Sequence, residues 1–341
     1  MNGTGYWITL AAGLILAGLL FVFRLREAGE DRKRAACFAP AAMAAGAVIA
    51  WLLAKAVFLL LNGWDLLSGE GIGAFFRLSP DEFSFVGGAV GMCLGIAAVA
   101  KTAEKRQWIR NRTAAVMDAF AVPGCLLIIF LRMAELFLEQ QGLGEMATVG
   151  LPEIEEGSLL AFAPLSMPDG WGGRLLSVCT LEALAALIIG ITCLLPRNRS
   201  LPEGLCFQQA AYRLCCIQIF LQLLRIVSSV FYFVHVDQAL CGVVLLGILI
   251  AVCRKIRKQG KKIPVSAPVL LIGGMVINGV TQFFMDKYWM LEDLLPVHVF
   301  EWINDNLAPL GFAIMLLTVL GMLLSWQILR KRLLAPCKPR I

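Results

Sequence analysis

The sequence is poor in the residues that soluble enzymes use most for chemistry and for contact with water. Only two of its 341 residues are histidine, four are tyrosine, and charged residues make up 16% of the chain. Hydrophobic residues reach 59%, and the mean hydropathy is +0.77. This composition excludes an ordinary soluble domain and indicates an integral membrane protein.

Two features that would define other functional classes are also missing. The 11 cysteines include no CxxC pair, so the usual zinc and redox motifs are absent, and most lie in apolar runs as small hydrophobes. The net charge is +6, but the basic residues form short clusters between apolar runs, which excludes a continuous nucleic-acid-binding face. The two histidines, His235 and His298, fall in predicted outer loops and are expected to be solvated.

Apolar stretches of about 17 to 25 residues can cross a bilayer as helices, and the sequence contains nine candidates. They cover residues 6–23, 39–61, 83–100, 114–138, 174–195, 205–233, 239–253, 265–284 and 307–329. We therefore predict an all-α, polytopic membrane bundle of about nine transmembrane helices. The first stretch has basic residues after it and none before it, the reverse of a cleavable signal peptide, so we expect it to remain as a helix.

Lysine and arginine predict the orientation of this bundle. With the N-terminus outside, 23 of the 30 basic residues fall on the cytoplasmic side, in segments 24–34, 101–112, 197–199, 254–262 and 330–340. The positive-inside rule therefore predicts that the N-terminus faces out and the C-terminus faces in. The acidic loops 139–173 and 285–306 then lie outside, and the second, which also holds four aromatic residues, is a candidate amphipathic helix at the interface.

Several polar side chains interrupt the apolar stretches near the predicted outer surface. At about 1.5 Å per helical residue, Arg132 lies roughly 30 Å beyond Arg112, the last cytoplasmic charge before it. Six polar groups from four helices reach the outer half of the membrane: Lys55, Arg132, Glu182, Gln218, Gln222 and Arg225. Asp118 and Arg213 lie deeper or nearer the cytoplasm, where a helix cap or a structural salt bridge is the expected role.

Arg132 begins a polar stripe, because Glu135 and Glu139 follow it at i+3 and i+7 on the same helix face. Polar stripes inside membranes usually face the bundle or a wet cavity, which favours one shared outer-leaflet site. The alternative is that Lys55, Arg132 and Arg225 extend separately to the outer headgroups, which costs little near a helix end.

Five segments match the spaced motifs of one enzyme family. "FSFVGGAVGMCLG" (83–95) is similar to F-H-G-G-L-x-G-G, with Gly87 and Gly88 on the paired glycines, and "DAFAVPGCLLIIFLRMAELFLEQ" (118–140) is similar to D-x-x-A-P followed by G-R-x-G-N-F-x-N-G-E. "LLAKAVFLLLN" (52–62), "SVCTLEAL" (177–184) and "QIFLQLLR" (218–225) are similar to G-A-R-x-G-Y, P-S-Q-L-Y-E-A and R-F-x-x-E-F-x-R. Over about residues 1–230 the chain thus resembles the prolipoprotein diacylglyceryl transferases of bacterial inner membranes.

The sequence also departs from this pattern. The substituted positions are Val86 for a histidine, Glu135 for an asparagine, Gln140 for a glutamate, and Gln218 and Gln222 for an arginine and a glutamate. The family usually has seven helices, so residues 1–233 are interpreted as the transferase-like core, with outer loop 139–173, and residues 234–341 as additional membrane helices.

The resemblance implies transfer of a diacylglyceryl group from phosphatidylglycerol to the lipobox cysteine of a prolipoprotein, without a metal or cofactor. The candidate catalytic residues are Arg132, which would stabilise the leaving phosphate, and Glu135 and Glu182, either of which could accept the thiol proton. The candidate substrate-binding residues are Lys55, Gly87, Gly88, Glu139, Gln218, Gln222 and Arg225.

Three alternatives accompany this hypothesis. Glu135 could simply neutralise Arg132 one turn away, which would stabilise the fold and weaken phosphate binding. The substitutions at Val86, Gln218 and Gln222 favour a relative that has lost catalysis and binds lipid or a partner membrane protein. An unrelated solute transporter would require a broken or inverted repeat, which the sequence does not contain.

The loop charges give a direct prediction of topology. Alkaline phosphatase, which is active only outside the cytoplasm, should be active when fused within 139–173 and inactive when fused after residue 330. Activity of both fusions measured in cells checks the orientation. An inactive fusion within 139–173, expressed at the same level, would contradict it.

Overall fold

The structure is a computed structural model that describes residues 4–62, 73–78, 82–138, 146–147, 154, 157–159, 161–162, 164–168, 173–195, 201–224, 230–231, 234–287, 290, 292 and 296–336. Within these ranges seven helices are long and apolar enough to cross a membrane. Two shorter apolar helices, α7 (Val178–Leu194) and α9 (Leu205–Leu221), accompany them. The helices indicate a multi-pass membrane protein, while the count of nine crossings stays a prediction.

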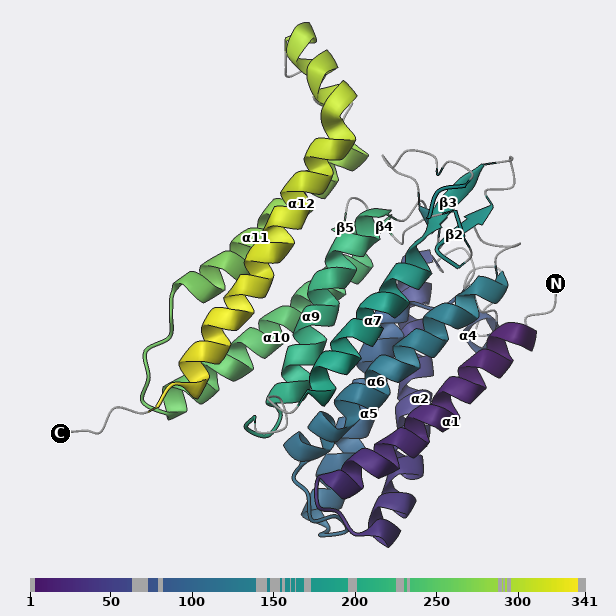
Figure 1. Ribbon diagram of the computed structural model, residues 1–341, viewed down its shortest axis with the longest axis vertical. Helices are drawn as coiled ribbons and strands as arrows, with labels where there is room; N and C mark the ends of the chain where they lie inside the picture. Colours follow the sequence, from purple (N-terminus) through teal and green to yellow (C-terminus); the bar gives the residue numbers. More distant parts are fainter. Residues whose placement is uncertain are drawn as a thin grey trace. The chain divides into compact units, whose positions relative to one another are not determined.

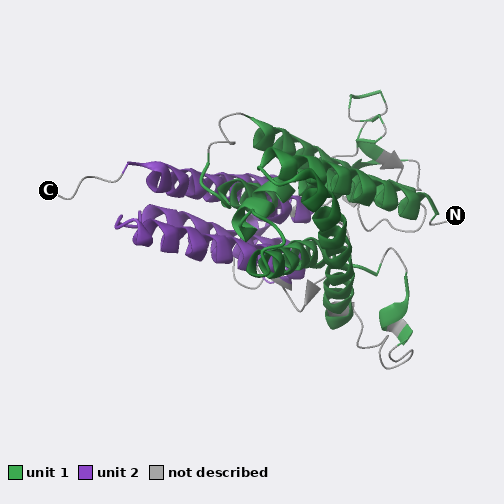
Figure 2. Ribbon diagram, turned by 90° about the horizontal axis from the view of Figure 1, so that it is seen from below, with its two compact units in different colours: residues 1–147, 154–214, 226–229 green, residues 148–153, 215–225, 230–341 purple. Residues whose placement is uncertain are grey.

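The chain divides into two compact units, coloured separately in Figure 2. Unit 1 comprises residues 1–147, 154–214 and 226–229, and unit 2 comprises residues 148–153, 215–225 and 230–341. The division falls inside α9, so the end of that helix belongs to unit 2.

Unit 1 is a bundle of helices that pack along most of their lengths (Figure 1). Its helices, besides α7 and the first part of α9, are α1 (Thr4–Glu27), α2 (Arg32–Asn62), the short α4 (Gly73–Phe76), α5 (Phe85–Lys105) and α6 (Thr113–Glu135). The main contacts are α2 with α5, α1 with α6, and α6 with α7. A buried apolar cluster that includes Phe21, Phe38, Ile96 and Phe120 fills the space between α1, α2, α5 and α6.

Small residues allow α2 and α5 to approach each other closely. A Cβ added at Gly91 would lie 2.6 Å from the carbonyl oxygen of Ile49 and 2.7 Å from the Cα of Ala50. A Cβ added at Gly95 would lie 2.7 Å from the Cα of Gly46. Because lipid tails are as apolar as side chains, close van der Waals packing of this kind is a main source of helix association in membranes.

Two carboxylates, Glu30, which is buried, and Asp118, which is partly buried, hold connections between the helices of unit 1. Glu30 accepts hydrogen bonds from the successive backbone amides of 110–111, at 2.8 and 3.2 Å. Asp118 accepts from the amides of Gly204, at 2.6 Å, and Phe207, at 2.8 Å, where α9 begins. Capping by Asp118, one of the two roles that the sequence left open for it, satisfies backbone donors that the first turn of a helix leaves without partners.

A small antiparallel sheet precedes α7. Its strands are β1 (Met146–Ala147), β2 (Ser166–Pro168) and β3 (Arg174–Ser177), in the order β1-β3-β2. Met146 pairs with Ser177 and Ser166 with Leu176. The predicted helix over 174–195 therefore begins only at Val178, because residues 174–177 pair as the central strand.

Unit 2 contains the end of α9, the 3-10 helix η3 (Gln222–Leu224), a hairpin of β4 (Val230–Phe231) and β5 (Val234–His235), and the helices α10 (Val236–Lys258), α11 (Ser266–Asp286) and α12 (Val297–Leu334). Helix α11 packs along α12 (Figure 1).

Three expectations are corrected in unit 2. The predicted helix 205–233 ends at Leu221, because η3 and β4 follow it. The last helix begins ten residues before the predicted residue 307, so 297–306 continues α12 instead of forming a separate interfacial helix. His235 is buried, whereas the sequence predicted a solvated loop histidine.

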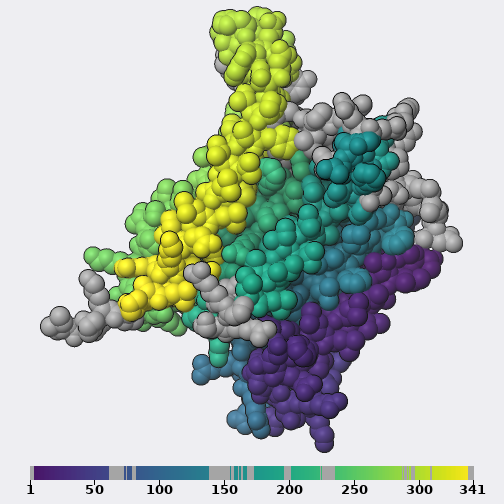
Figure 3. All heavy atoms as spheres, in the orientation of Figure 1, coloured from purple at the N-terminus to yellow at the C-terminus, as the bar shows by residue number. Residues whose placement is uncertain are grey.

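Apolar side chains cover long stretches of the molecular surface, as a membrane environment requires. Helix α1, which is purple in Figure 3, carries Ile8, Ile15 and Leu19, each more than three-fifths exposed. Leu317 on α12 is exposed to a similar extent.

The contact between α2 and α5 predicts a stability change. Gly91→Ala should lower the free energy of unfolding by about 1–3 kcal/mol through overpacking, although alanine favours helix by about 0.5–1 kcal/mol. Gly247→Ala on α10 is the matched control, because no atom lies within 4 Å of its added Cβ. Thermal unfolding of both purified variants checks this, and equal melting temperatures would contradict the packing role.

Candidate functional site

Arg132 lies at the centre of a buried ionic cluster in unit 1. Its side chain has no exposed surface, and its Nη1 donates to both carboxylate oxygens of Glu135, at 2.6 and 2.8 Å. Its Nε lies 2.5 Å from Oε2 of Glu182. Its Cζ lies 3.6 Å from the centre of the Phe85 ring, in a cation–π contact. These four residues are called the Arg132 centre below.

Three helices bring these side chains together. Arg132 and Glu135 occupy the last turn of α6, Phe85 begins α5, and Glu182 lies in the second turn of α7, just after β3. This end of α6 adjoins the start of α1, since a Cβ added at Gly5 would lie 2.7 Å from the Phe137 ring. In the predicted topology, the Arg132 centre therefore lies at the outer end of the bundle.

Lys55 forms a second buried ion pair. Its side chain has no exposed surface, and its Nζ donates to Oε2 of Glu82 at 2.6 Å. The same Nζ lies 5.2 Å from the centre of the Phe83 ring and 5.7 Å from that of Phe58. Nη1 of Arg77 lies 3.5 Å from Oε1, the other carboxylate oxygen of Glu82. The alternative that Lys55 and Arg132 extend separately to lipid headgroups is thus wrong, because both are fully buried against carboxylates.

Lys55 and Arg132 both contact the same short segment of the chain, residues 82–85. Lys55 contacts Glu82 and Phe83, and Arg132 contacts Phe85. The backbone of Ser84 ties this segment to α2, because its amide donates to the carbonyl of Ala54 at 3.1 Å. The start of α5 therefore lies between the two predicted cations.

The charges of the Arg132 centre do not balance within it. One guanidinium faces two carboxylates, which gives a net charge of −1 when both are ionised. Removing charges from water is expensive, and a buried pair is favourable only when its geometry and hydrogen bonds are good. An external anion that approached the Nη1 or the Nε side of Arg132 would have to displace a carboxylate before it could bind there.

Gly87 and Gly88 face α2. A Cβ at Gly87 would lie 3.1 Å from the carbonyl oxygen of Leu53, and one at Gly88 would lie 3.5 Å from the Cβ of Ala54. Ser84 caps this helix start, since its Oγ accepts from the amide of Gly87 at 3.1 Å. The glycines thus have a packing role in unit 1, and contact with a substrate stays a prediction.

The remaining predicted residues do not join the Arg132 centre in what the structure describes. Glu139 and Arg225 lie outside the described residues. Gln218 and Gln222 belong to unit 2, where both are buried, and Nε2 of Gln218 and Oε1 of Gln222 have no hydrogen-bond partner in the described part of the chain. Arg213 donates to Oγ1 of Thr192 at 3.0 Å, a contact between α9 and α7.

Sequence reasoning missed Glu82, Phe83 and Phe85. Glu82 directly precedes an apolar stretch and lies 27 residues along the chain from the lysine that it neutralises, so no sequence pattern connects the two. The only sequence signal for Phe85 is its position two residues before the glycine pair, and a phenylalanine in an apolar run is usually core.

Comparison of the chain with protein-family models, with curated proteins and with solved structures found no match. Within the described ranges, no group of three or more histidine, cysteine or acidic residues is arranged to hold a metal ion. The side chains that form the Arg132 centre are a guanidinium, two carboxylates and an aromatic ring.

The unequal burial of the two carboxylates gives a stability prediction. Arg132→Met should lower the free energy of unfolding by about 3–5 kcal/mol, because it removes the guanidinium that both carboxylates contact. Glu135→Asn should cost less than half as much, since Glu182 still pairs with Arg132. Arg106→Met, at an exposed arginine, is the control. Equal unfolding curves for the Arg132→Met and Arg106→Met proteins would show that the ion cluster does not stabilise the fold.

Proposed function

We propose that this protein transfers the diacylglyceryl group of phosphatidylglycerol to a prolipoprotein cysteine at the outer leaflet of the bacterial inner membrane. The observation that supports this proposal best is the meeting of three predicted catalytic residues, Arg132, Glu135 and Glu182, within hydrogen-bonding distance. They come from two separate matching segments of the sequence, and the helix that begins at Phe85 carries a third matching segment.

The proposed reaction uses the groups of the Arg132 centre. The cysteine sulfur attacks the phosphate-bearing carbon of the diacylated glycerol, so that a C–S bond forms and the bond from this carbon to the phosphate oxygen breaks. The electron pair leaves with glycerol phosphate, whose charge the guanidinium of Arg132 stabilises. The thiol proton passes to a carboxylate, for which Glu182 is the better placed, because it is the more deeply buried of the two.

Binding of the lipid phosphate on the Nη1 or the Nε side requires Arg132 to exchange a partner. Glu135 is the carboxylate that would yield, because its side chain is 11% exposed whereas that of Glu182 is 3% exposed. Glu135 also precedes the η1 turn (Leu136–Leu138) at the end of the helix. The phosphate would then occupy the Nη1 side of the guanidinium while Glu182 holds its Nε side.

A second candidate function is lipid or protein binding by a relative without catalysis. The specific observation in its favour is that protein carboxylates already occupy both the Nη1 and Nε sides of Arg132. Val86, which stands where the family has histidine, is buried and cannot move a proton. In this case the Arg132 centre is architecture, and Glu135 neutralises Arg132 permanently.

One assay separates the two candidates. Purified protein in phosphatidylglycerol vesicles, given a lipobox peptide with a free thiol, should increase the peptide mass by one diacylglyceryl group. Arg132→Lys should slow this transfer by roughly tenfold or more, because lysine keeps the charge but loses the planar fork of donors. No transfer by the unaltered protein, or equal rates for both proteins, would reject the enzymatic proposal.

Lipid affinity of Glu135→Asn is measured on the same preparations. Under the enzymatic proposal this variant should bind phosphatidylglycerol more tightly, because a competing carboxylate is gone. Glu301→Asn is the matched control, since it removes an exposed carboxylate elsewhere in the chain. Unchanged affinity together with a lower melting temperature would support the structural role of Glu135 instead.

A further inference from the structure

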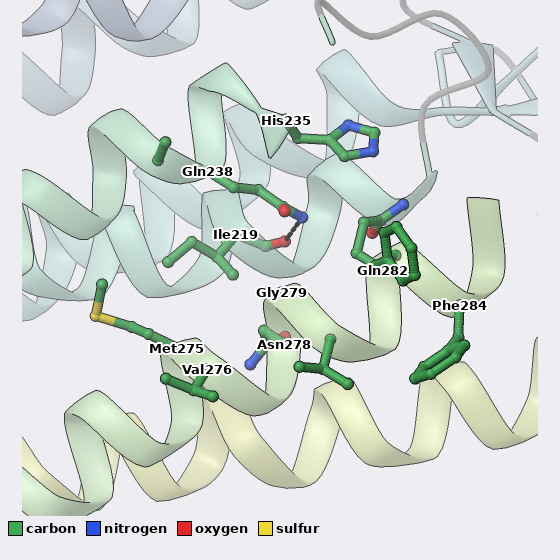
Figure 4. Close-up of a pocket in the computed structure, with 12 residues that line it drawn as sticks. Ile219, His235, Gln238, Met275, Val276, Asn278, Gly279, Gln282 and Phe284 are labelled. Atoms are coloured by element: carbon green, nitrogen blue, oxygen red, sulfur yellow. Dashed lines mark hydrogen bonds between the residues drawn. The ribbon is translucent and has the colours of Figure 1, made fainter. Parts of the chain in front are cut away.

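Unit 2 contains a second group of buried polar side chains, which lines a cavity of about 610 Å³ (Figure 4). The end of α9, the start of α10 and the middle of α11 surround it. Its polar lining residues are His235, Gln238, Asn278 and Gln282. Cavities of this size, mainly apolar with a few polar groups, are typical of sites for small ligands.

Asn278 leaves one hydrogen-bonding atom of this lining without a partner. The residue is 2% exposed, and its Nδ2 donates to the carbonyl of Gly274 at 2.8 Å and to Oγ1 of Thr318 at 2.5 Å. The Thr318 hydroxyl itself donates to the carbonyl of Met315, at 2.9 Å, so it can only accept from Asn278. These contacts fix the amide orientation, and Oδ1 is a buried acceptor without a partner in the described chain.

A buried acceptor in this state is costly unless something donates to it. A polar group that loses its hydrogen bond in an apolar environment costs about 1–3 kcal/mol. The amide of Gln238 is already used as a donor, because its Nε2 donates to the carbonyl of Ile219 at 3.1 Å, shown as a dashed line in Figure 4. A ligand donor, such as a hydroxyl group, would satisfy Asn278.

The rest of the lining defines the remainder of the ligand. Apart from the polar residues it consists of Ile219, Ala239, Met275, Phe283 and Phe284, together with Val276, Gly279 and Val280. Among these described lining residues, His235 is the one titratable side chain. Val276, Gly279 and Val280 are exposed, so the cavity opens on that side of α11. This surface suits an apolar chain and holds no fixed charge for a phosphate.

We propose that this cavity binds an uncharged lipid that carries a free hydroxyl group, and that the hydroxyl donates to Oδ1 of Asn278. The shared chemistry is that of an alcohol, and the commitment to a lipid rests on the apolar lining and on the open side of α11. The proposal is independent of the Arg132 centre, all of whose residues belong to unit 1.

Gly279 provides a way to fill the cavity without breaking a contact. It lines the cavity, and no atom lies within 4 Å of a Cβ added there. Gly279→Leu should therefore occupy the ligand space without a clash. Gly273→Leu is the matched control, because Gly273 lies on the same helix, has the same open space and does not line the cavity.

The test measures equilibrium binding of radiolabelled 1,2-dioctanoylglycerol to the purified full-length protein in detergent. Gly279→Leu should raise the dissociation constant at least tenfold, and Gly273→Leu should leave it within about twofold. Equal binding by the Gly279→Leu and unaltered proteins would overturn the site. Loss of binding in both leucine variants would also overturn it, because the effect would then not depend on the cavity.

Recognition of the hydroxyl is tested separately. The acetylated analogue, which has no donor, should bind about three- to tenfold more weakly than dioctanoylglycerol, the worth of one neutral hydrogen bond. Asn278→Leu should remove this difference, and its melting temperature shows whether the protein is still folded. Equal affinity of the two lipids for the unaltered protein would overturn the role of Asn278, a result that needs no variant.

Free glycerol distinguishes a lipid alcohol from a water-soluble one. It should not compete with dioctanoylglycerol at concentrations a thousandfold higher, because it cannot cover the apolar lining. Full competition by glycerol would overturn the lipid assignment. Failure of any of these experiments leaves the transfer assay unaffected, since the variants lie in unit 2 and the proposed catalytic residues in unit 1.

Discussion

The burial of the Arg132 guanidinium is the constraint on which the outer end of unit 1 depends. A charge moved into a medium of low dielectric costs many kcal/mol unless opposite charges and hydrogen bonds meet it there. Here the compensation comes from α5, α6 and α7 together, through Phe85, Glu135 and Glu182. Helix α7 cannot move away from α6 without separating Glu182 from Arg132, and α5 would lose the cation–π contact of Phe85, so one side chain links the ends of three helices.

The same contacts give the centre a structural role as well as its proposed catalytic one. An arginine that binds a phosphate in a dry site must be present before the phosphate arrives, and in the meantime something else must neutralise it. The two carboxylates do so, with one acid more than the guanidinium requires. Catalysis at the centre then requires that the electrostatic energy gained when the lipid phosphate binds Arg132 exceeds the energy lost when Glu135 leaves it. These two energies are of similar size.

The helical character of the chain follows from the sequence, because the length of the apolar stretches reflects the thickness of the bilayer. Counting depth along the helices also found Lys55, Arg132 and Glu182, which are all buried polar groups. The partner of Lys55 was missed, because Glu82 belongs to another segment and no periodicity connects the two. The predicted helix over 205–233 extends too far because the apolar run continues past Leu221 to Val230 and Phe231, which form β4 instead.

The buried polar side chains of the two units differ in their partners, and this difference affects how a ligand could bind in each unit. At the Arg132 centre the charges lie against one another, so a ligand must compete with contacts that already exist. In the cavity of unit 2 the polar groups are mostly amides, and one acceptor, Oδ1 of Asn278, has no partner among the described residues. A ligand there only adds a hydrogen bond. Uncharged lipids, even weakly bound ones, can bind where nothing has to be displaced. An anion on the Nη1 side of Arg132, in contrast, must bring enough charge to separate an ion pair.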